Sequence, residues 1–194
     1  MKNLFTKGLA LTLMASIVLF TSCKDDDNSS NTPEAGGTLT VGTTTVDLES
    51  ALLTPYGPYT ATSYNIDLEL ASVEIDEETL EPIMDGSPIA DLYLEVFTDN
   101  AATLSEGIYT YSLTGDAFTF DYGDVTFDVM GEDFMNVNAG TLTILRDGNT
   151  YEITFEGTTA DGTNVSAYYK GKTYILSNGE NRAMSPKAKK KALK

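Results

Sequence analysis

The chain contains no histidine and no tryptophan, and Cys23 is the only cysteine among its 194 residues. These absences remove several kinds of active site. A Ser-His-Asp triad, a Cys-His pair and a zinc site with histidine or cysteine ligands all need residues that the chain lacks. An intramolecular disulfide is excluded too, because it needs two cysteines. Any catalysis would have to rely on carboxylates, tyrosines or the few lysines.

Positive charge is scarce as well, and it is unevenly placed. Residues 38–180 carry 25 Asp and Glu side chains against three cations, Arg146, Lys170 and Lys172, which is a local net charge of −22. So negative a domain repels phosphate groups, which excludes nucleic acid as its partner. Residues 181–194 carry six cations and no acid. We expect this basic tail to be solvated and disordered; the alternatives are that it lies on the acidic domain or touches another envelope component.

The chain begins with the parts of a secretory signal. Lys2 and Lys7 supply a positive start, and Leu9–Phe20 is an apolar run. The run has about 12 residues, whereas a helix that spans a bilayer needs roughly 20. Residues 1–22 are therefore predicted to be a signal peptide and not a permanent membrane span.

A single cysteine stands close behind the apolar run, in the sequence Phe20-Thr21-Ser22-Cys23. This sequence resembles a bacterial lipobox, and the resemblance implies that Cys23 is lipidated and becomes the N-terminus of the mature chain. Several acyl chains on one residue anchor a protein far better than a single chain, whose binding is marginal. The alternative is an ordinary cleaved signal followed by a cysteine with no such role.

Lys24, Asp25, Asp26 and Asp27 follow the cysteine directly. They are similar to the surface-export signal of Bacteroidota lipoproteins. The resemblance implies a lipid-anchored protein of the outer membrane that faces the exterior; the alternative is a charged spacer that keeps the linker solvated. Residues 23–37 are polar with almost no apolar groups, which predicts a flexible tether with a reach of about 20 Å.

From Thr38 onward the apolar residues recur with a period of two, which is typical of strands with one buried face. The alternation is clear in residues 64–70, 141–144 and 151–156. Asp147-Gly148 and Asp161-Gly162 have the turn chemistry of β-hairpins. The last third of the domain is thus predicted to be a meander of three or four antiparallel strands.

The remaining strands are expected from the same pattern between turn residues. They are Thr38–Val41, Thr45–Leu48, Tyr59–Ala71, Ile89–Thr98, Gly107–Leu113, Ala117–Phe120 and Val125–Met130. Around Leu92–Phe97 both faces of the strand are apolar, which indicates a central strand. Nine or ten short strands predict one all-β domain over 38–180, an antiparallel β-sandwich, with a closed antiparallel β-barrel as the alternative.

Two groups of carboxylates are candidates for a cation site. One is the acidic insertion Glu74–Asp85, and the other combines Asp121, Asp124 and Asp128. Oxygen ligands suit hard cations such as Ca²⁺, and the composition leaves a site of this kind possible. However, neither group has EF-hand spacing, and Asp and Gly are also the ordinary residues of turns. We favour solvated turns, with Asp121 and Asp124 flanking one of them, and no metal.

Tyr56 and Tyr59 lie in a segment, Thr54–Tyr59, that proline and glycine make rigid, and we expect this segment to be a loop. Tyrosine offers a flat apolar face and a hydroxyl at low entropic cost, which suits ligand binding. The alternative is that the rings cap an open end of the sandwich.

These observations together predict a lipid-anchored, non-catalytic protein of the cell envelope that binds a glycan or a surface partner. Across 38–176 the chain resembles, in style, the small β-sandwich lipoproteins of Bacteroidota. The alternative is a structural or assembly accessory of the outer envelope with no small-molecule ligand. A third candidate is a carboxylate-dependent hydrolase, which would need two acids about 5–9.5 Å apart in a cleft.

Overall fold

The computed structural model describes residues 35–128 and 134–176. The predicted signal peptide, Cys23, the export signal at 24–27 and the basic tail 181–194 lie outside the described residues. Within the described ranges the regular structure is entirely β, so no helix there is long and apolar enough to cross a membrane.

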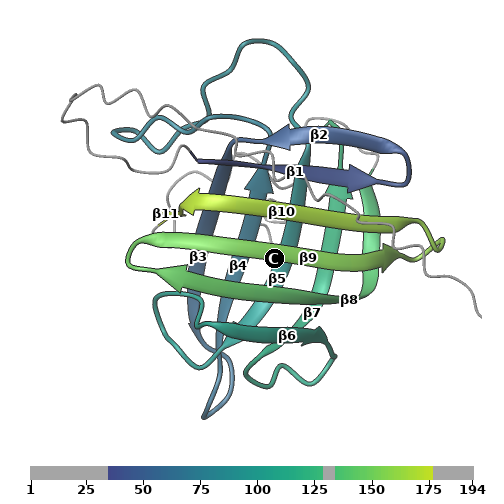
Figure 1. Cartoon of the computed structure of the whole chain (residues 1–194). Coiled ribbons are helices and arrows are strands. Elements are labelled where there is room, and N and C mark those ends of the chain that lie inside the picture. Colours follow the sequence, from purple (N-terminus) through teal and green to yellow (C-terminus); the bar gives the residue numbers. More distant parts are fainter. Residues whose placement is uncertain (1–34, 129–133, 177–194) are drawn as a thin grey trace, which may run out of the picture. The chain divides into compact units, whose positions relative to one another are not determined.

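Eleven strands follow one another along the described chain (Figure 1). They are β1 (Gly36–Val41), β2 (Thr44–Leu48), β3 (Ser50–Pro58), β4 (Tyr64–Ala71), β5 (Asp91–Thr98), β6 (Gly107–Tyr111), β7 (Thr119–Thr126), β8 (Phe134–Asp147), β9 (Thr150–Thr159), β10 (Asn164–Lys172) and β11 (Tyr174–Ile175). Hydrogen bonds join them into one sheet in the order β11-β3-β4-β5-β7-β6-β8-β9-β10-β1-β2, with a further pairing of β7 and β8. Two of the pairings, β11 with β3 and β6 with β7, are parallel.

The sheet is strongly curled and forms a half-barrel. In Figure 1, β3, β4, β5 and β7 form a layer that lies behind β8, β9 and β10 and crosses them at a steep angle. The all-β prediction is confirmed. The finer choice between a sandwich and a closed barrel stays a prediction.

The main core lies between these two layers. Leu68 and Leu70 of β4 are fully buried in it, as are Ile153 and Phe155 of β9. The ring of Phe120 from β7 meets Phe155 edge to face, with 5.9 Å between the ring centroids. Burial of each such side chain stabilises the fold by about 1.5–3 kcal/mol, so this core is what holds the two layers together.

The C-terminal meander is confirmed. β8, β9 and β10 pair antiparallel in chain order, and the predicted Asp-Gly sequences lie in the two connections. Gly148 has a φ of 59° and Gly162 a φ of 88°, which only glycine adopts without a steric penalty. The fourth predicted strand does not join the meander, because β11 pairs with β3 instead.

The loop expected at Thr54–Tyr59 is wrong, because β3 continues to Pro58. Proline lacks the N–H group for a ladder hydrogen bond and is tolerated at sheet edges and bulges. β11 is two residues long, so among the described strands Pro55 has a paired neighbour on one side, β4. A register shift between Pro55 and Gly57 shows a bulge at this point.

The turn predicted between Asp121 and Asp124 is also wrong, since both residues lie inside β7. Gly123 serves packing here and not a turn. A Cβ on Gly123 would lie 2.6 Å from Leu94 Cδ2 and 3.1 Å from the carbonyl oxygen of Tyr93, so glycine suits the close packing of β5 against β7 at this position. Two of the predicted strands, Ala117–Phe120 and Val125–Met130, are therefore parts of one continuous strand within the described residues.

Candidate functional site

The outer face of β4, β5 and β7, on the side opposite the core, carries carboxylates and tyrosines. Residues that pair directly across antiparallel strands project from the same face. The register places Glu69, Tyr93 and Asp124 in one row across the three strands. Together with the neighbouring row and the first residue of β5 they make up what we call the acid–tyrosine face: Asp67, Glu69, Asp91, Tyr93, Glu95, Tyr122 and Asp124.

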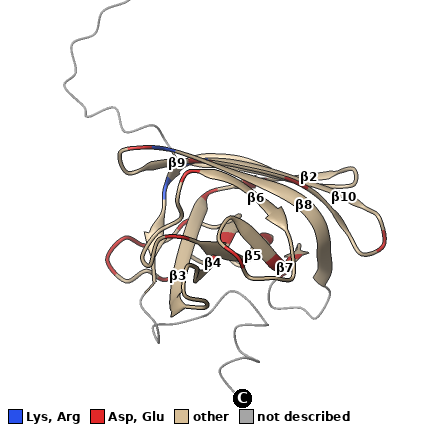
Figure 2. Ribbon diagram, turned by 90° about the horizontal axis from the view of Figure 1, so that it is seen from below, with Lys and Arg blue, Asp and Glu red and all other residues tan. Residues whose placement is uncertain are grey.

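Much of this face is buried although it points away from the core, while Glu69, Glu95 and Tyr122 are half-buried. Asp91 is 0 % exposed and Tyr93 is 3 % exposed, and Asp67 and Asp124 are buried as well. Figure 2 shows acidic residues on the layer of β5 and β7, while β8, β9 and β10 lie on the opposite, core side of that layer. Carboxylates are rarely fully buried unless they have a partner, so the acid–tyrosine face needs an explanation.

Glu69 and Asp91 experience the strongest effect of this burial. Burial raises the pKa of Glu69 to about 8, and the charges of Asp124 and Asp67 add to the rise. The pKa of Asp91 is raised well above its ordinary value, first by burial and then by the charge of Glu69. Neither carboxylate oxygen of Asp91 has a hydrogen bond of good geometry, and neither does Glu69 Oε1, although the two carboxyl groups lie close enough to influence each other's pKa. The raised pKa values favour the protonated carboxylic acid at both positions.

Tyr93 and Tyr122 connect the two rows of the acid–tyrosine face through hydrogen bonds and a contact between their rings. The Tyr122 hydroxyl donates a 2.7 Å hydrogen bond to Asp124 Oδ2, and the Tyr93 hydroxyl lies 3.5 Å from Glu95 Oε1. The two rings meet edge to face at 6.2 Å between centroids. Burial raises the pKa of both phenols, and the next contribution comes from Asp67 for Tyr93 and from Asp124 for Tyr122. Both phenols therefore keep their protons and serve as donors to the acids.

The predicted ligand tyrosines lie at the β3 side of the same layer. Tyr56 is half-buried on β3 and is close enough to Tyr93 to influence its pKa. Tyr59 is 56 % exposed, and its ring lies 4.6 Å from that of Phe97 on β5. Phe97 pairs with Asn65 one row beyond Asp67, so it belongs to the same outer face. Tyr59 thus covers Phe97 in part and keeps an accessible side.

The structure places Asp121, Asp124 and Asp128 in three different environments. Asp121 falls at a register shift of β7 against β5, Asp124 belongs to the acid–tyrosine face, and Asp128 is exposed beyond the strand end. Among residues 35–128 and 134–176 no group of three or more carboxylates is arranged to hold a metal ion. Glu132 and Asp133, the next two acids in the sequence, lie outside the described residues.

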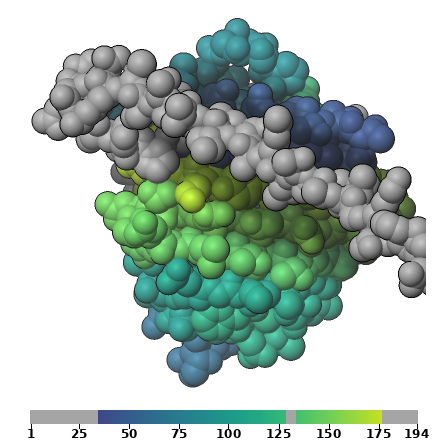
Figure 3. Space-filling model, in the orientation of Figure 1, coloured from purple at the N-terminus to yellow at the C-terminus, as the bar shows by residue number. Residues whose placement is uncertain are grey.

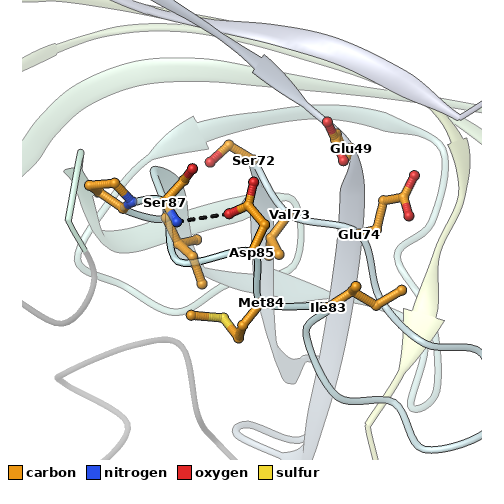
Figure 4. Close-up of a pocket in the computed structure, with 10 residues that line it drawn as sticks. Glu49, Ser72, Val73, Glu74, Ile83, Met84, Asp85 and Ser87 are labelled. Carbon is orange, nitrogen blue, oxygen red and sulfur yellow. Dashed lines mark hydrogen bonds between the residues drawn. The ribbon is translucent and has the colours of Figure 1, made fainter.

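The acidic insertion Glu74–Asp85 bounds a pocket of about 380 Å³ beyond the ends of β4 and β5 (Figure 4). The pocket is lined by Glu49, Ser72, Val73, Glu74, Ile83, Met84, Asp85, Ser87, Pro88 and Ile89. Figure 4 shows that the Asp85 carboxylate turns to the backbone N–H of Ser87, and this 2.8 Å hydrogen bond lowers its pKa. A second pocket, of about 410 Å³, shares Glu49 and Glu74 and is also lined by Tyr174.

Asp76, in the same insertion, forms hydrogen bonds within its own turn. Its Oδ1 accepts hydrogen bonds from the backbone N–H groups of Thr79, at 2.8 Å, and Glu78, at 2.9 Å. These bonds lower the pKa of Asp76, with the Thr79 bond as the largest cause. Such a geometry is an ordinary Asx turn and accounts for the aspartate without a ligand.

The sequence pattern did not single out Glu69, Asp91 and Tyr93. An acid that alternates with apolar residues on a strand predicts a solvated face, and the alternation in residues 64–70 predicts one for Asp67 and Glu69. The double-faced apolar pattern at Leu92–Phe97 was the one available signal that the outer face of β5 is covered.

Comparison with known proteins gives no relative from which a function could be inferred: no protein-family model, no curated protein and no solved structure matches the chain.

Proposed function

We propose that the chain is a lipid-anchored, non-catalytic binding protein of a bacterial outer membrane, and that it holds a glycan or a surface partner on the outer side of the β3–β4–β5–β7 layer. The observation that carries this proposal is the shared location of Tyr56 and Tyr59 with the acid–tyrosine face. Sugar rings stack on aromatic faces, and their hydroxyl groups donate hydrogen bonds to carboxylates. The anchor and the exterior location rest on Cys23 and residues 24–27.

The non-catalytic part of the proposal is supported by where the perturbed carboxylates lie. A general acid needs a raised pKa and access to substrate in a cleft. Glu69 and Asp91 have raised pKa values, but neither lines a described pocket. Asp85 lines a pocket, but its pKa is lowered. No described pocket therefore combines the two requirements.

We further propose that the curled sheet is an open, sandwich-like structure and not a closed barrel. Its strand order has two ends, β11 and β2, and does not return on itself. An open arrangement leaves the outer side of β3, β4 and β5 as an independent surface.

Binding is tested with the mature chain and polysaccharides, by glycan array followed by calorimetry. We expect affinity to fall with Tyr56→Ala and with Tyr59→Ala. Tyr168→Ala is the matched control, because Tyr168 is 40 % exposed on the outer side of the other layer. Equal affinities of the unsubstituted chain and the three variants would refute glycan binding by this face. The absence of binding to any glycan, together with unchanged attachment of the variants to cells, would refute it as well. Stoichiometric crosslinking to one envelope protein would then favour the accessory role.

The anchor and the exterior location have separate tests. Mass spectrometry of the mature N-terminus should find an acylated Cys23, and an unmodified cysteine would overturn the anchor. Protease added to intact cells should remove the domain. Replacement of Asp25, Asp26 and Asp27 by alanine should then protect it, and unchanged cleavage would count against an export signal.

A further inference from the structure

The acid–tyrosine face receives no positive charge from the described residues. Lys170 pairs with Glu152 at 2.8 Å, and Lys172 pairs with Glu77 at 3.0 Å. Arg146 donates to the carbonyl of Gly148 and lies over the ring of Tyr151. These three are the cations of residues 35–128 and 134–176. Any cation that lies against Glu69 and Asp91 must therefore come from outside these two ranges.

Asp91 shows most directly that a partner is needed. It is 0 % exposed, and neither of its carboxylate oxygens has a hydrogen bond of good geometry, although the Glu69 carboxyl group and the Thr126 backbone lie near enough to influence its pKa. Burial of a polar group without a hydrogen bond costs about 1–3 kcal/mol in proteins, and burial of a charge costs more unless it is paired. A cation placed against Asp91 and its neighbour Glu69 would remove this cost.

The described chain ends beside this face. The backbone N–H of Leu176 donates to the carbonyl of Leu53 on β3, and its side chain packs in a small cluster with Leu52 and Ala71. Leu52 pairs with Glu69, so this cluster adjoins the acid–tyrosine face on the same side of the sheet. Residues 177–194 thus continue from the rim of the face.

The length and the charge of residues 177–194 both suit contact with the acid–tyrosine face. Strands lie about 4.8 Å apart, so the way from β3 across β4 and β5 to β7 is about 14 Å. The six residues from Leu176 to Arg182 can span up to about 20 Å. The segment 182–194 contains no acid and carries six cations, Arg182, Lys187, Lys189, Lys190, Lys191 and Lys194. In the predicted mature chain the one further cation outside the described residues is Lys24.

We propose that the acid–tyrosine face is the docking surface for the basic C-terminal segment of the same chain, residues 182–194. The segment supplies the ammonium and guanidinium groups that neutralise the buried carboxylates. This intramolecular partner goes beyond the proposed ligand and does not depend on it. Its docking would also make the C-terminal segment a competitor for any ligand that reaches the carboxylates.

The test is a spin label on the segment. The chain 23–194 with Cys23→Ser has no other thiol, so Ser185→Cys accepts a single nitroxide. In a ¹⁵N-labelled sample, we expect the amide signals of β4, β5 and β7 to lose intensity, while those of β9 and β10, a layer about 10 Å further away, are affected less. At 1 M salt the Debye length falls from about 10 Å to about 3 Å, and the lost signals should return.

Variants decide whether charge directs the docking. Replacement of the six cations of the segment by glutamine should abolish the selective signal loss, and Glu69→Gln with Asp124→Asn should weaken it. Glu152→Gln with Glu156→Gln, on β9, is the matched control and should leave it unchanged. Equal loss in both layers, or selective loss that survives the neutralised segment, would overturn the proposal. In a further sample, ¹⁵N-labelled chains without a spin label are mixed with spin-labelled chains that carry no ¹⁵N. Signal loss in this mixture would assign the face to a second copy of the chain and would also overturn the proposal.

Discussion

β10 and β5 occupy equivalent places in the sheet, each with an antiparallel partner on both sides, yet their outer faces differ. In β10 every second residue is exposed, Tyr168 and Lys170 among them. The layer of β8, β9 and β10, in green, faces the viewer in Figure 3. In β5 the residues on both faces are buried, and Asp91 and Tyr93 are on the outer one. The inner faces of both strands are equally buried. The difference between the two layers is therefore a property of their outer faces.

The same chemical group behaves oppositely on the two outer faces. Glu152 on β9 accepts a hydrogen bond from Lys170, which lowers its pKa. Glu69 on β4 is half-buried, and its removal from solvent, together with the charges of Asp124 and Asp67, raises its pKa to about 8. A cross-strand cation and solvent thus favour the carboxylate on one layer, and burial favours the carboxylic acid on the other. The comparison shows that the acids of β4, β5 and β7 are not part of a merely solvated surface.

The largest effect on stability is expected from truncation of core side chains, which tests whether the inner faces of the two layers are alike. Leu94→Ala on β5 and Ile153→Ala on β9 each remove a fully buried side chain from the common core. We expect each to lower the free energy of unfolding by about 2–5 kcal/mol, because a cavity adds to the lost burial. Urea unfolding followed by circular dichroism measures both. If one layer tolerated its truncation and the other did not, the two layers would not share one core.

Glu69→Gln tests the outer faces through pH. The raised pKa of Glu69 means that the folded chain holds a proton which the unfolded chain releases near its ordinary pKa of 4.5. Stability therefore falls as the pH rises from about 4.5 through about 8. Glutamine stays neutral, so we expect the variant to gain about 1–4 kcal/mol above pH 8 and almost nothing at pH 4.5, since one pKa unit is worth about 1.4 kcal/mol.

The measurement is a series of urea unfolding curves across this pH range, in the chain whose six C-terminal cations are replaced by glutamine. In that chain no cation of the segment can lower the pKa of Glu69. Glu152→Gln is the control with the opposite sign, because its lowered pKa gives stability that is lost as the pH falls. An equal gain in the free energy of unfolding in both variants, or a gain that does not depend on pH, would contradict the difference between the two outer faces. A smaller gain with the natural segment would be a further sign of docking.

The layer of β8, β9 and β10 was predictable from sequence because its signals are local. Alternation on one strand and Asp-Gly in the next connection are enough to give strands, turns and antiparallel pairing. In β3 and β7 the local signals are misleading, since Pro55, Gly57 and Gly123 favour a loop or a turn in isolation. Their strand conformation is set by neighbours distant in sequence, such as Leu94 against Gly123.

The acid–tyrosine face was not predictable for the same reason. Its residues come from three strands, and the row of Glu69, Tyr93 and Asp124 exists only through the register between them. Two registers must be known to within one residue before these side chains share a face. Composition could show that many acids are present, but not which of them are buried together.

The smallest expected difference lies between two hydroxyl groups. Tyr122→Phe removes the 2.7 Å hydrogen bond to the buried carboxylate of Asp124, whereas Tyr168→Phe removes a 3.4 Å contact with Glu152 at the surface. Bonds to charged groups contribute more than neutral ones, and loss of a donor to a buried acceptor adds a desolvation cost. We expect Tyr122→Phe to cost about 1–2 kcal/mol in urea unfolding at pH 7 and Tyr168→Phe to have no measurable effect. If the two variants were equally stable, the Tyr122 hydroxyl would be solvated like that of Tyr168, and the outer face of β7 would be as open as that of β10.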